Sequence, residues 1–232
     1  MRLPLLALTL LFLAGCGSDS TSLPQGSEPS KLEPGDFVSE VDNPYWPMTP
    51  GSTWVYREDG QRVEVTVTDR KKQIVGIPAT VVHDVVTEDG ARVEDTWDWY
   101  AQDKDGNVWY LGEDTKEYEN GKVKSTEGSW QAGVDGAEAG VVVPAKPEVG
   151  LTYRQEYYKG EAEDAARILS LDERVEVPFG RFTDVLMTKD YTPLEPRILE
   201  HKFYAKGVGP LLALTVSGGS DREELIRFQR GS

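Results

Sequence analysis

The chain has 232 residues, a formal net charge of −15 and one cysteine. So acidic a composition argues against binding to nucleic acid or adhesion to anionic lipid headgroups, and it is compatible with cations, cationic partners or simple solubility. A single cysteine excludes a disulfide within the chain, so the fold must be held together by its core alone.

Residues 1–15 have the pattern of an export signal. A short charged start precedes an apolar run over residues 3–13, which is too short to span a bilayer because spanning needs about 20 residues. The run ends in Leu-Ala-Gly-Cys at residues 13–16, which resembles the lipobox of bacterial lipoproteins. That resemblance implies that Cys16 is lipidated and anchors the chain to the extracytoplasmic face of a cell membrane. An ordinary signal peptide with a chance cysteine is the alternative.

Residues 16–43 are expected to form the lipid anchor and a flexible tether. Ser, Gly, Pro and Glu dominate this stretch, which has few large apolar residues. Such a composition cannot bury enough apolar surface to offset the entropy lost on ordering the chain. The sequence therefore predicts that the folded part begins near Tyr45-Trp46-Pro47.

Residues 44–125 are expected to form a first antiparallel β unit. Val63, Val65 and Val67 alternate with polar residues, as in a half-buried strand, and Gly-containing turn sequences separate one such strand from the next. Helical periodicity is scarce along the chain. The pattern indicates an antiparallel meander.

The segment 93–113 predicts a β-hairpin, with its turn at residues 103–107 and with Gly106 able to take the positive φ of a bulged loop. Pairing of Asp103 with Asn107 sets the register. The facing pairs are then Ala101 with Trp109, Trp99 with Leu111, and Tyr100 with Tyr110. Because side chains alternate across a strand, Trp97, Trp99 and Trp109 share one face, which is expected to be core or the wall of a pocket.

Residues 126–149 interrupt the meander with a stretch rich in glycine and alanine, read as a long crossover loop with one short strand. Loops this long inside a compact domain are uncommon and are often functional. Trp130 lies within it. Either the loop folds back and buries Trp130, or Trp130 stays exposed as a contact for a ligand or partner.

Residues 150–232 are expected to form a second β unit that repeats the first. Three landmarks recur in the same order at offsets of about 100 residues, which indicates an internal duplication. They are Pro50–Trp54 and Val149–Tyr153, Ile77-Pro78 and Val177-Pro178, and Trp99–Ala101 and Phe203–Ala205. The expected fold is mainly β with little helix, two similar antiparallel β-meander units packed as a sandwich or as half-barrels. The alternative is that the two meanders share turn residues by chance.

The motif Val177–Phe182, followed by Phe203–Gly209, resembles a pair of motifs in uncharacterised bacterial lipoproteins near the LolA/LolB-like half-barrel β group. The resemblance covers roughly residues 150–229. It implies a curled antiparallel sheet that exposes a concave apolar face, and it implies no catalytic residues.

Motifs of nucleophilic, nucleotide-binding and metalloprotease sites are missing from the sequence, so we expect no catalytic residue, metal or cofactor. His83 and His201 are too few for a zinc site. One alternative remains, a cell-envelope hydrolase or its accessory subunit. It would use the acidic cluster of Glu94, Asp95, Asp98, Glu113 and Asp114, because paired carboxylates can cleave glycosidic bonds.

The sequence thus favours a lipid-anchored, extracytoplasmic binding or scaffolding lipoprotein without catalytic activity. The expected partners are the membrane, through the lipidated N-terminus, and an apolar ligand or an envelope protein, but no nucleic acid. The candidate binding residues are aromatic because aromatic side chains suit apolar ligand pockets. They are Tyr100, Tyr110, Trp130 and Tyr204.

Lipidation of Cys16 predicts that the chain fractionates with membranes after a high-salt wash and that its N-terminal peptide carries acyl mass. Cys16→Ser should release the protein, because each buried methylene of the acyl chains contributes about 0.8 kcal/mol to anchoring. Fractionation followed by immunoblotting checks this. A Cys16→Ser protein that stays with the washed membranes would refute lipid anchoring.

Overall fold

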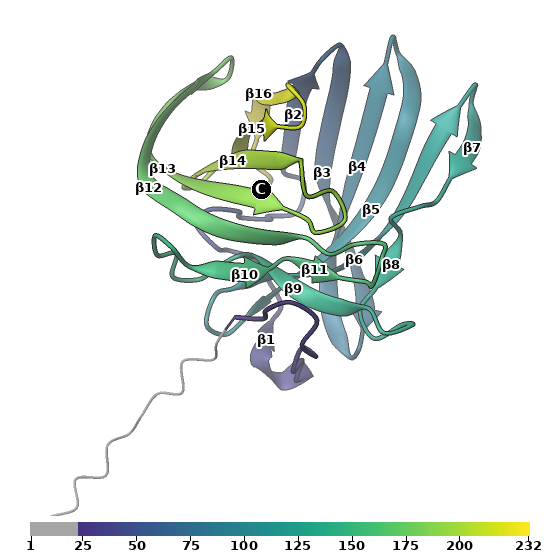
Figure 1. Cartoon of the computed structure of the whole chain (residues 1–232), viewed down its shortest axis with the longest axis vertical. Helices are drawn as coiled ribbons and strands as arrows, with labels where there is room; N and C mark the ends of the chain where they lie inside the picture. The colour runs from purple at the N-terminus through teal and green to yellow at the C-terminus, as the bar shows by residue number, and fades with distance from the viewer. Residues whose placement is uncertain (1–22) are drawn as a thin grey trace, which may run out of the picture.

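A computed structural model describes residues 23–232 and shows an almost entirely β molecule (Figure 1). One antiparallel sheet of 16 strands curls into a nearly closed barrel, which confirms the predicted fold class. A 3-10 helix, η1 (Pro34–Asp36), is short, and no helix within residues 23–232 is long and apolar enough to cross a membrane. The predicted signal peptide and Cys16 lie outside the described residues.

The sheet consists of two halves with the same strand order. In sheet order the first half is β2 (Thr53–Glu58), β3 (Gln61–Ile74), β4 (Ile77–Glu88), β5 (Ala91–Asp103), β6 (Val108–Glu119) and β9 (Glu138–Val143). The second half is β10 (Thr152–Arg154), β12 (Ala165–Val177), β13 (Gly180–Tyr191), β14 (Leu199–Ala205), β15 (Gly209–Ser217) and β16 (Arg222–Gln229). Pairing of β16 with β2 joins the halves, and one hydrophobic core runs through both.

Four short strands complete the sheet: β1 (Phe37–Val38), β7 (Lys122–Ser125), β8 (Trp130–Gln131) and β11 (Glu156–Tyr157). The first pairs with β5, the next two with β6 and the last with β9. All four therefore pair with strands of the first half.

The duplication holds at the level of strand order, whereas one of its expected landmarks is displaced. Pro78 is the second residue of β4, but Pro178 lies in the turn between β12 and β13. Both prolines thus lie at the same end of equivalent hairpins, but one is in a strand and the other in a turn. The expectation that Pro78 and Pro178 occupy matching positions is therefore wrong. A two-residue turn accepts proline because that position needs no ladder N–H.

The predicted β5–β6 hairpin forms. Tyr100 pairs with Tyr110 and Ala101 with Trp109, as expected, and the backbone N–H of Asp103 donates to the Asn107 carbonyl oxygen at 3.0 Å. The expected pairing of Trp99 with Leu111 is wrong. A β-bulge between Asp98 and Tyr100 shifts the register there, so that Asp98 pairs with Glu113.

The barrel closes along a seam at residues 152–157. The first part of this stretch, β10, pairs with β12, and the second part, β11, pairs with β9. At Gly140 in β9 a Cβ atom would lie 2.3 Å from the carbonyl carbon of Gln155, so only glycine lets the two backbones approach this closely.

The N-terminal segment that was expected to be a flexible tether is ordered from residue 23 onward, so the prediction is wrong for residues 23–43. Arg154, which is 2% exposed, donates to the carbonyl oxygens of Gly26, Glu28 and Ala139 at 2.9, 2.6 and 2.6 Å. Such charge-assisted bonds to the backbone compensate for the poor hydrophobicity of the segment. Composition alone misses them because Arg154 lies far away in the sequence.

Residues 41–48 link two loops of the barrel by hydrogen bonds, and we call them the plug. The Asn43 side-chain amide donates to the Gly106 carbonyl oxygen at 2.8 Å, and the Gly207 N–H donates to the Pro44 carbonyl oxygen at 2.7 Å. The plug therefore holds two equivalent loops, β5–β6 and β14–β15, one from each half.

The crossover at residues 126–149 holds two strands, β8 and β9, and not the one that was expected. Trp130 in β8 is 5% exposed, so the crossover is folded back onto the barrel. Its backbone comes so close to Gly112 that a Cβ there would lie 2.3 Å from the Trp130 carbonyl oxygen. Because Gly112 has a φ of 127°, a conformation that other residues rarely adopt, glycine is required on both counts.

Replacement of Trp130 by alanine should lower the free energy of unfolding by about 3 kcal/mol, as large-to-small core changes do. Val134→Ala is a control in the same crossover, because Val134 is 45% exposed and should change stability by less than about 0.5 kcal/mol. Urea denaturation measures both. Equal stabilities of the two variants would mean that Trp130 does not belong to the core.

Candidate functional site

A cavity of about 350 Å3 occupies the interior of the barrel, and we call it the lumen cavity. Its walls come from both halves, since β2–β6, β9, β11 and β14–β16 all contribute side chains, and Trp46 of the plug contributes as well. The volume lies in the range of pockets that take small molecules. The curl of the duplicated sheet and the plug together create this space.

Aromatic rings form one side of the lumen cavity. The Trp46 ring lies 5.3 Å from that of Tyr100 and 6.2 Å from that of Tyr204, and Tyr110 stacks on Tyr100 at 4.9 Å. Tyr100 and Tyr204 are equivalent in the two halves, so the plug inserts its tryptophan between two copies of one position. Behind them, Trp130 meets Tyr110 edge to face at 5.4 Å.

Carboxylates line the rest of the cavity. Among the described residues of its wall, six are acidic and one, Lys202, is a cation. The Lys202 Nζ lies 3.5 Å from Asp190 Oδ2 and 3.6 Å from Glu200 Oε2, so carboxylates already surround its charge. Burial alone would lower the pKa of Lys202, but these neighbours raise it well above its ordinary value. The acidic wall residues are Asp84, Asp98, Glu113, Glu156, Asp164 and Glu223.

The pKa of several of these acids is raised, chiefly because burial disfavours the charged form. Burial raises the pKa of Asp98 to about 7, although the Tyr110 hydroxyl donates to its Oδ1 at 2.7 Å and opposes the shift. Burial and then Asp98 raise the pKa of Glu113 to about 9, and burial and then Glu58 raise that of Glu223 to about 7. The cavity therefore holds protons near neutral pH that exposed carboxyls would have lost.

Glu156 links the cavity to the crossover, because its Oε2 accepts a hydrogen bond from Trp130 Nε1 at 2.7 Å. Burial and then Asp164 raise the pKa of Glu156. Glu156 and Asp164 also line a neighbouring pocket of about 720 Å3, whose other wall includes Gln25 and Pro196. The two pockets thus meet at this pair of carboxylates.

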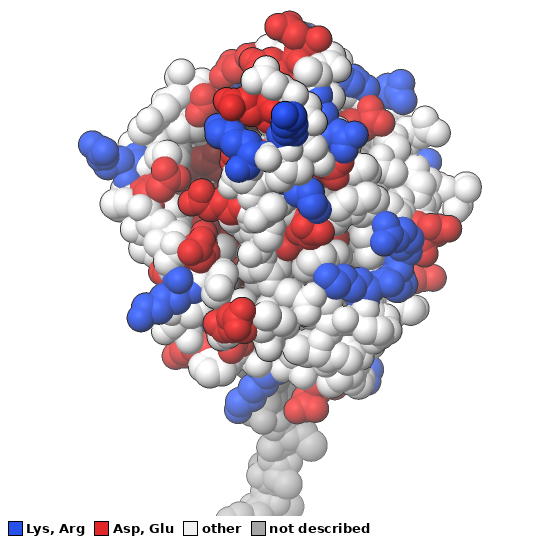
Figure 2. All heavy atoms as spheres, turned by 90° about the vertical axis from the view of Figure 1, so that its right-hand side faces the viewer, with Lys and Arg blue, Asp and Glu red and all other residues white. Residues whose placement is uncertain are grey.

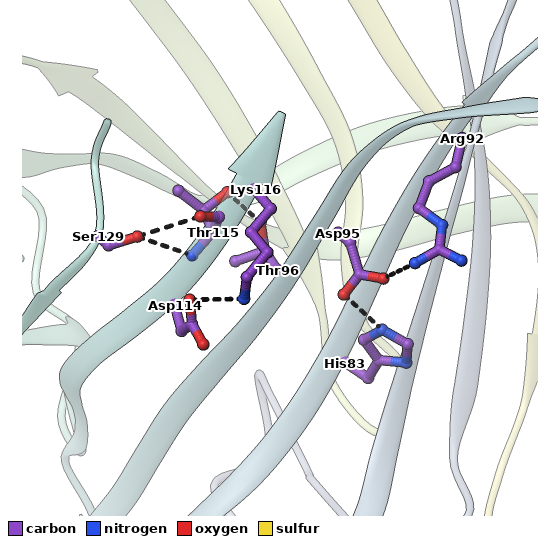
Figure 3. Close-up of polar contacts among 8 residues, drawn as sticks. All are labelled: His83, Arg92, Asp95, Thr96, Asp114, Thr115, Lys116 and Ser129. Carbon is purple, nitrogen blue, oxygen red and sulfur yellow. Dashed lines mark hydrogen bonds and ion pairs between the residues drawn. The ribbon is translucent and has the colours of Figure 1, made fainter. Parts of the chain in front are cut away.

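The acidic cluster that the sequence grouped around Asp98 is divided between the two faces of the sheet. Asp98 and Glu113 face the lumen cavity. Asp95 instead pairs with Arg92 and lies 3.1 Å from His83 Nε2, and Asp114 accepts from Lys116 at 2.9 Å, so these two are held in surface ion pairs (Figure 3). A shared location in the sequence therefore misled, because neighbours on a strand point to opposite faces.

The three tryptophans of the hairpin lie on the face away from the lumen cavity. Trp97 stacks on His83 at 3.9 Å, Lys72 lies over Trp99 at 3.0 Å, and Trp109 meets Phe37 edge to face at 6.1 Å. None of the three lines the cavity: Trp99 belongs to the hydrophobic core, and Trp97 and Trp109 pack against it.

Of the four candidate binding residues, Tyr100, Tyr110 and Tyr204 line the cavity. Trp130 does not line it, but contacts two residues that do, Tyr110 and Glu156. Sequence reasoning missed Trp46, Lys202 and the other wall carboxylates. Asp84 carried one usable signal, because a carboxylate inside the β-branched run of β4 is costly to bury without a partner. Glu156 and Glu223 carried none.

Acidic groups also gather near the top of the face shown in Figure 2, with Lys and Arg side chains among them. Within residues 23–232 no group of three or more His, Cys, Asp or Glu side chains has the geometry to hold a metal ion.

No family model matches the chain, and no match was found among curated proteins. Among solved structures it is similar to one described as a "putative lipoprotein from Parabacteroides distasonis ATCC 8503". The TM-score is 0.37 and the identity 11%, over 80% of this chain and 98% of that chain. A similarity this low carries no argument about this chain.

The raised pKa values predict that stability falls as the pH rises. Unfolded carboxyls lose their protons near pH 4 to 4.5, whereas the folded chain keeps one on Glu113 until about pH 9 and others on Asp98 and Glu223 until about pH 7. The folded state thus binds more protons between these limits. Each such proton lowers the free energy of unfolding by about 1.4 kcal/mol per pH unit.

Thermal melts between pH 5 and pH 9.5 should therefore show a falling Tm, and Glu113→Gln should flatten the fall. Glu64→Gln is the matched control, because Glu64 lies in β3 with half of its side chain exposed and pairs only with Arg62 among the described residues. A wild-type Tm that rises over this range would contradict the assignment of protonated acids to the cavity.

Proposed function

We propose that this chain is a membrane-anchored, extracytoplasmic binding protein that holds a small molecule in the lumen cavity. The observation that carries the proposal is the cavity itself, about 350 Å3 in volume, with aromatic rings on one side and polar, mostly acidic groups on the other. Such composition is typical of pockets that bind small molecules. Trp46 of the plug contributes one of these rings.

The anchor in this proposal is the lipidated Cys16. The described chain begins beside the seam, where Arg154 holds residues 26–28. Residues 16–22 can span at most about 25 Å, at about 3.5 Å per residue, so the barrel would stay close to the membrane surface. The resemblance of residues 150–229 to lipoproteins near the LolA/LolB-like group is a further support for an envelope location.

One observation favours the alternative function, a hydrolase that uses the acidic pair near Asp98. Asp98 and Glu113 are directly opposite each other across β5 and β6, and their raised pKa values are those of general acids. Binding is the better-supported function because it uses the whole wall of the cavity, whereas the hydrolase uses two of its six carboxylates.

Native mass spectrometry of the full-length chain, isolated from the cells that make it, should show a bound small molecule. Ala213→Trp should abolish the added mass because Ala213 lines the cavity and a tryptophan there fills it. Ala91→Trp should keep the added mass because Ala91 is exposed at the start of β5.

Two results of this experiment would contradict the proposal. One is wild-type protein without any bound molecule. The other is an added mass that Ala213→Trp and Ala91→Trp both retain, since the molecule would then bind outside the lumen. A bound molecule that Asp98→Asn protects from hydrolysis would support the hydrolase instead.

A further inference from the structure

Asp84 of β4 presents an unpaired acceptor in the wall of the lumen cavity. Among the described residues no group donates a hydrogen bond to its side chain, and its Oδ1 has no accessible surface, so the carboxylate meets the cavity through its other oxygen. Buried carboxylate oxygens are normally paired, because leaving one without a donor costs free energy. A carboxylate without a donor in the wall of a cavity indicates a donor that arrives with a ligand.

The surroundings of Asp84 specify the charge of that donor. After burial, the groups that most raise the pKa of Asp84 are Asp98, Glu223 and Glu94, all of them acidic. The single cation of the wall, Lys202, already faces Asp190 and Glu200 at 3.5 and 3.6 Å. A positive charge near Asp84 would therefore meet several carboxylates and no competing cation, whereas a negative charge would be repelled.

The rest of the wall specifies an organic ligand. Trp46, Tyr100 and Tyr204 offer ring faces, which attract ammonium groups and also cover apolar carbon chains. The cavity volume of about 350 Å3 is far larger than a bare metal ion requires and suits a molecule of several carbon atoms.

We propose that the lumen cavity binds a small organic cation, a primary alkylammonium, whose ammonium group donates to the Asp84 carboxylate while its carbon chain lies against Trp46, Tyr100 and Tyr204. The inference rests on the proposed function and adds the chemical class of the ligand. It joins three features that are independent of one another, the unpaired oxygen, the excess of carboxylates and the aromatic side.

Three probes of equal chain length test the head group: hexylammonium chloride, 1-hexanol and sodium hexanoate. Isothermal titration calorimetry of the full-length chain at about pH 8 should show hexylammonium binding at least about tenfold more tightly than hexanol, because bonds between ions are the stronger ones. Hexanoate should not bind. Calcium chloride at the same concentration should not displace hexylammonium.

Asp84→Asn should weaken hexylammonium at least about tenfold and leave hexanol nearly unchanged, because it removes the charge and keeps the shape. Asp69→Asn is the matched control, since Asp69 is an exposed aspartate of the neighbouring strand β3, and it should leave both affinities unchanged. Should Asp84→Asn fail to fold, Glu223→Gln makes the same test, because Glu223 lines the cavity and its charge acts on Asp84.

Equal binding of hexylammonium and hexanol would overturn the inference and leave a lumen that binds neutral molecules. Displacement by calcium would overturn it in favour of a metal ion, and absence of binding by all three probes would also overturn it. The proposed function fails separately, if native mass spectrometry finds no molecule that Ala213→Trp excludes.

Discussion

The seating of the plug against both halves of the barrel is the contact on which the rest of the structure depends. Its backbone and Asn43 bind the β5–β6 loop of one half and the β14–β15 loop of the other. Pairing of β16 with β2 and the seam at residues 152–157 close the sheet, and the plug links the two loops to each other. In the same place it inserts Trp46 between Tyr100 and Tyr204, so the plug also builds one side of the cavity.

The acidic cavity shows that the interior is not optimised for stability alone. Carboxyls from β4, β5, β6, β11 and β16 lie in one space, and burial together with mutual repulsion raises the pKa of most of them. A chain selected only for packing would place apolar residues at these positions. Buried carboxyls that lower stability are expected where a protein binds a ligand, and here they are concentrated in the walls of one cavity.

The sequence found the aromatic part of the candidate site and missed the acidic part. Tyr100 and Tyr110 followed from the hairpin register, and Tyr204 followed from the repeat of Trp99–Ala101 in Phe203–Ala205. Both arguments use short-range pairing, which a sequence displays directly. Asp84, Glu156 and Glu223 lie on strands far apart along the chain, and only the curl of the sheet brings them together. The grouping of Asp95 with Asp98 failed because side chains alternate along a strand, so residues three positions apart face opposite sides.

By itself the sequence determined the strands, the hairpin around Asp103, the order of the duplicated meanders and the N-terminal signal pattern. Each of these depends on alternation or turn chemistry within a few residues, or on a comparison of the chain with itself. Tertiary structure alone decided that the halves share one barrel, that residues 23–43 lie ordered against it, and which face of each strand looks inward. Those outcomes depend on contacts between residues far apart in the sequence, such as Arg154 with Gly26 and Asn43 with Gly106. The local pattern of polar and apolar residues does not indicate such contacts.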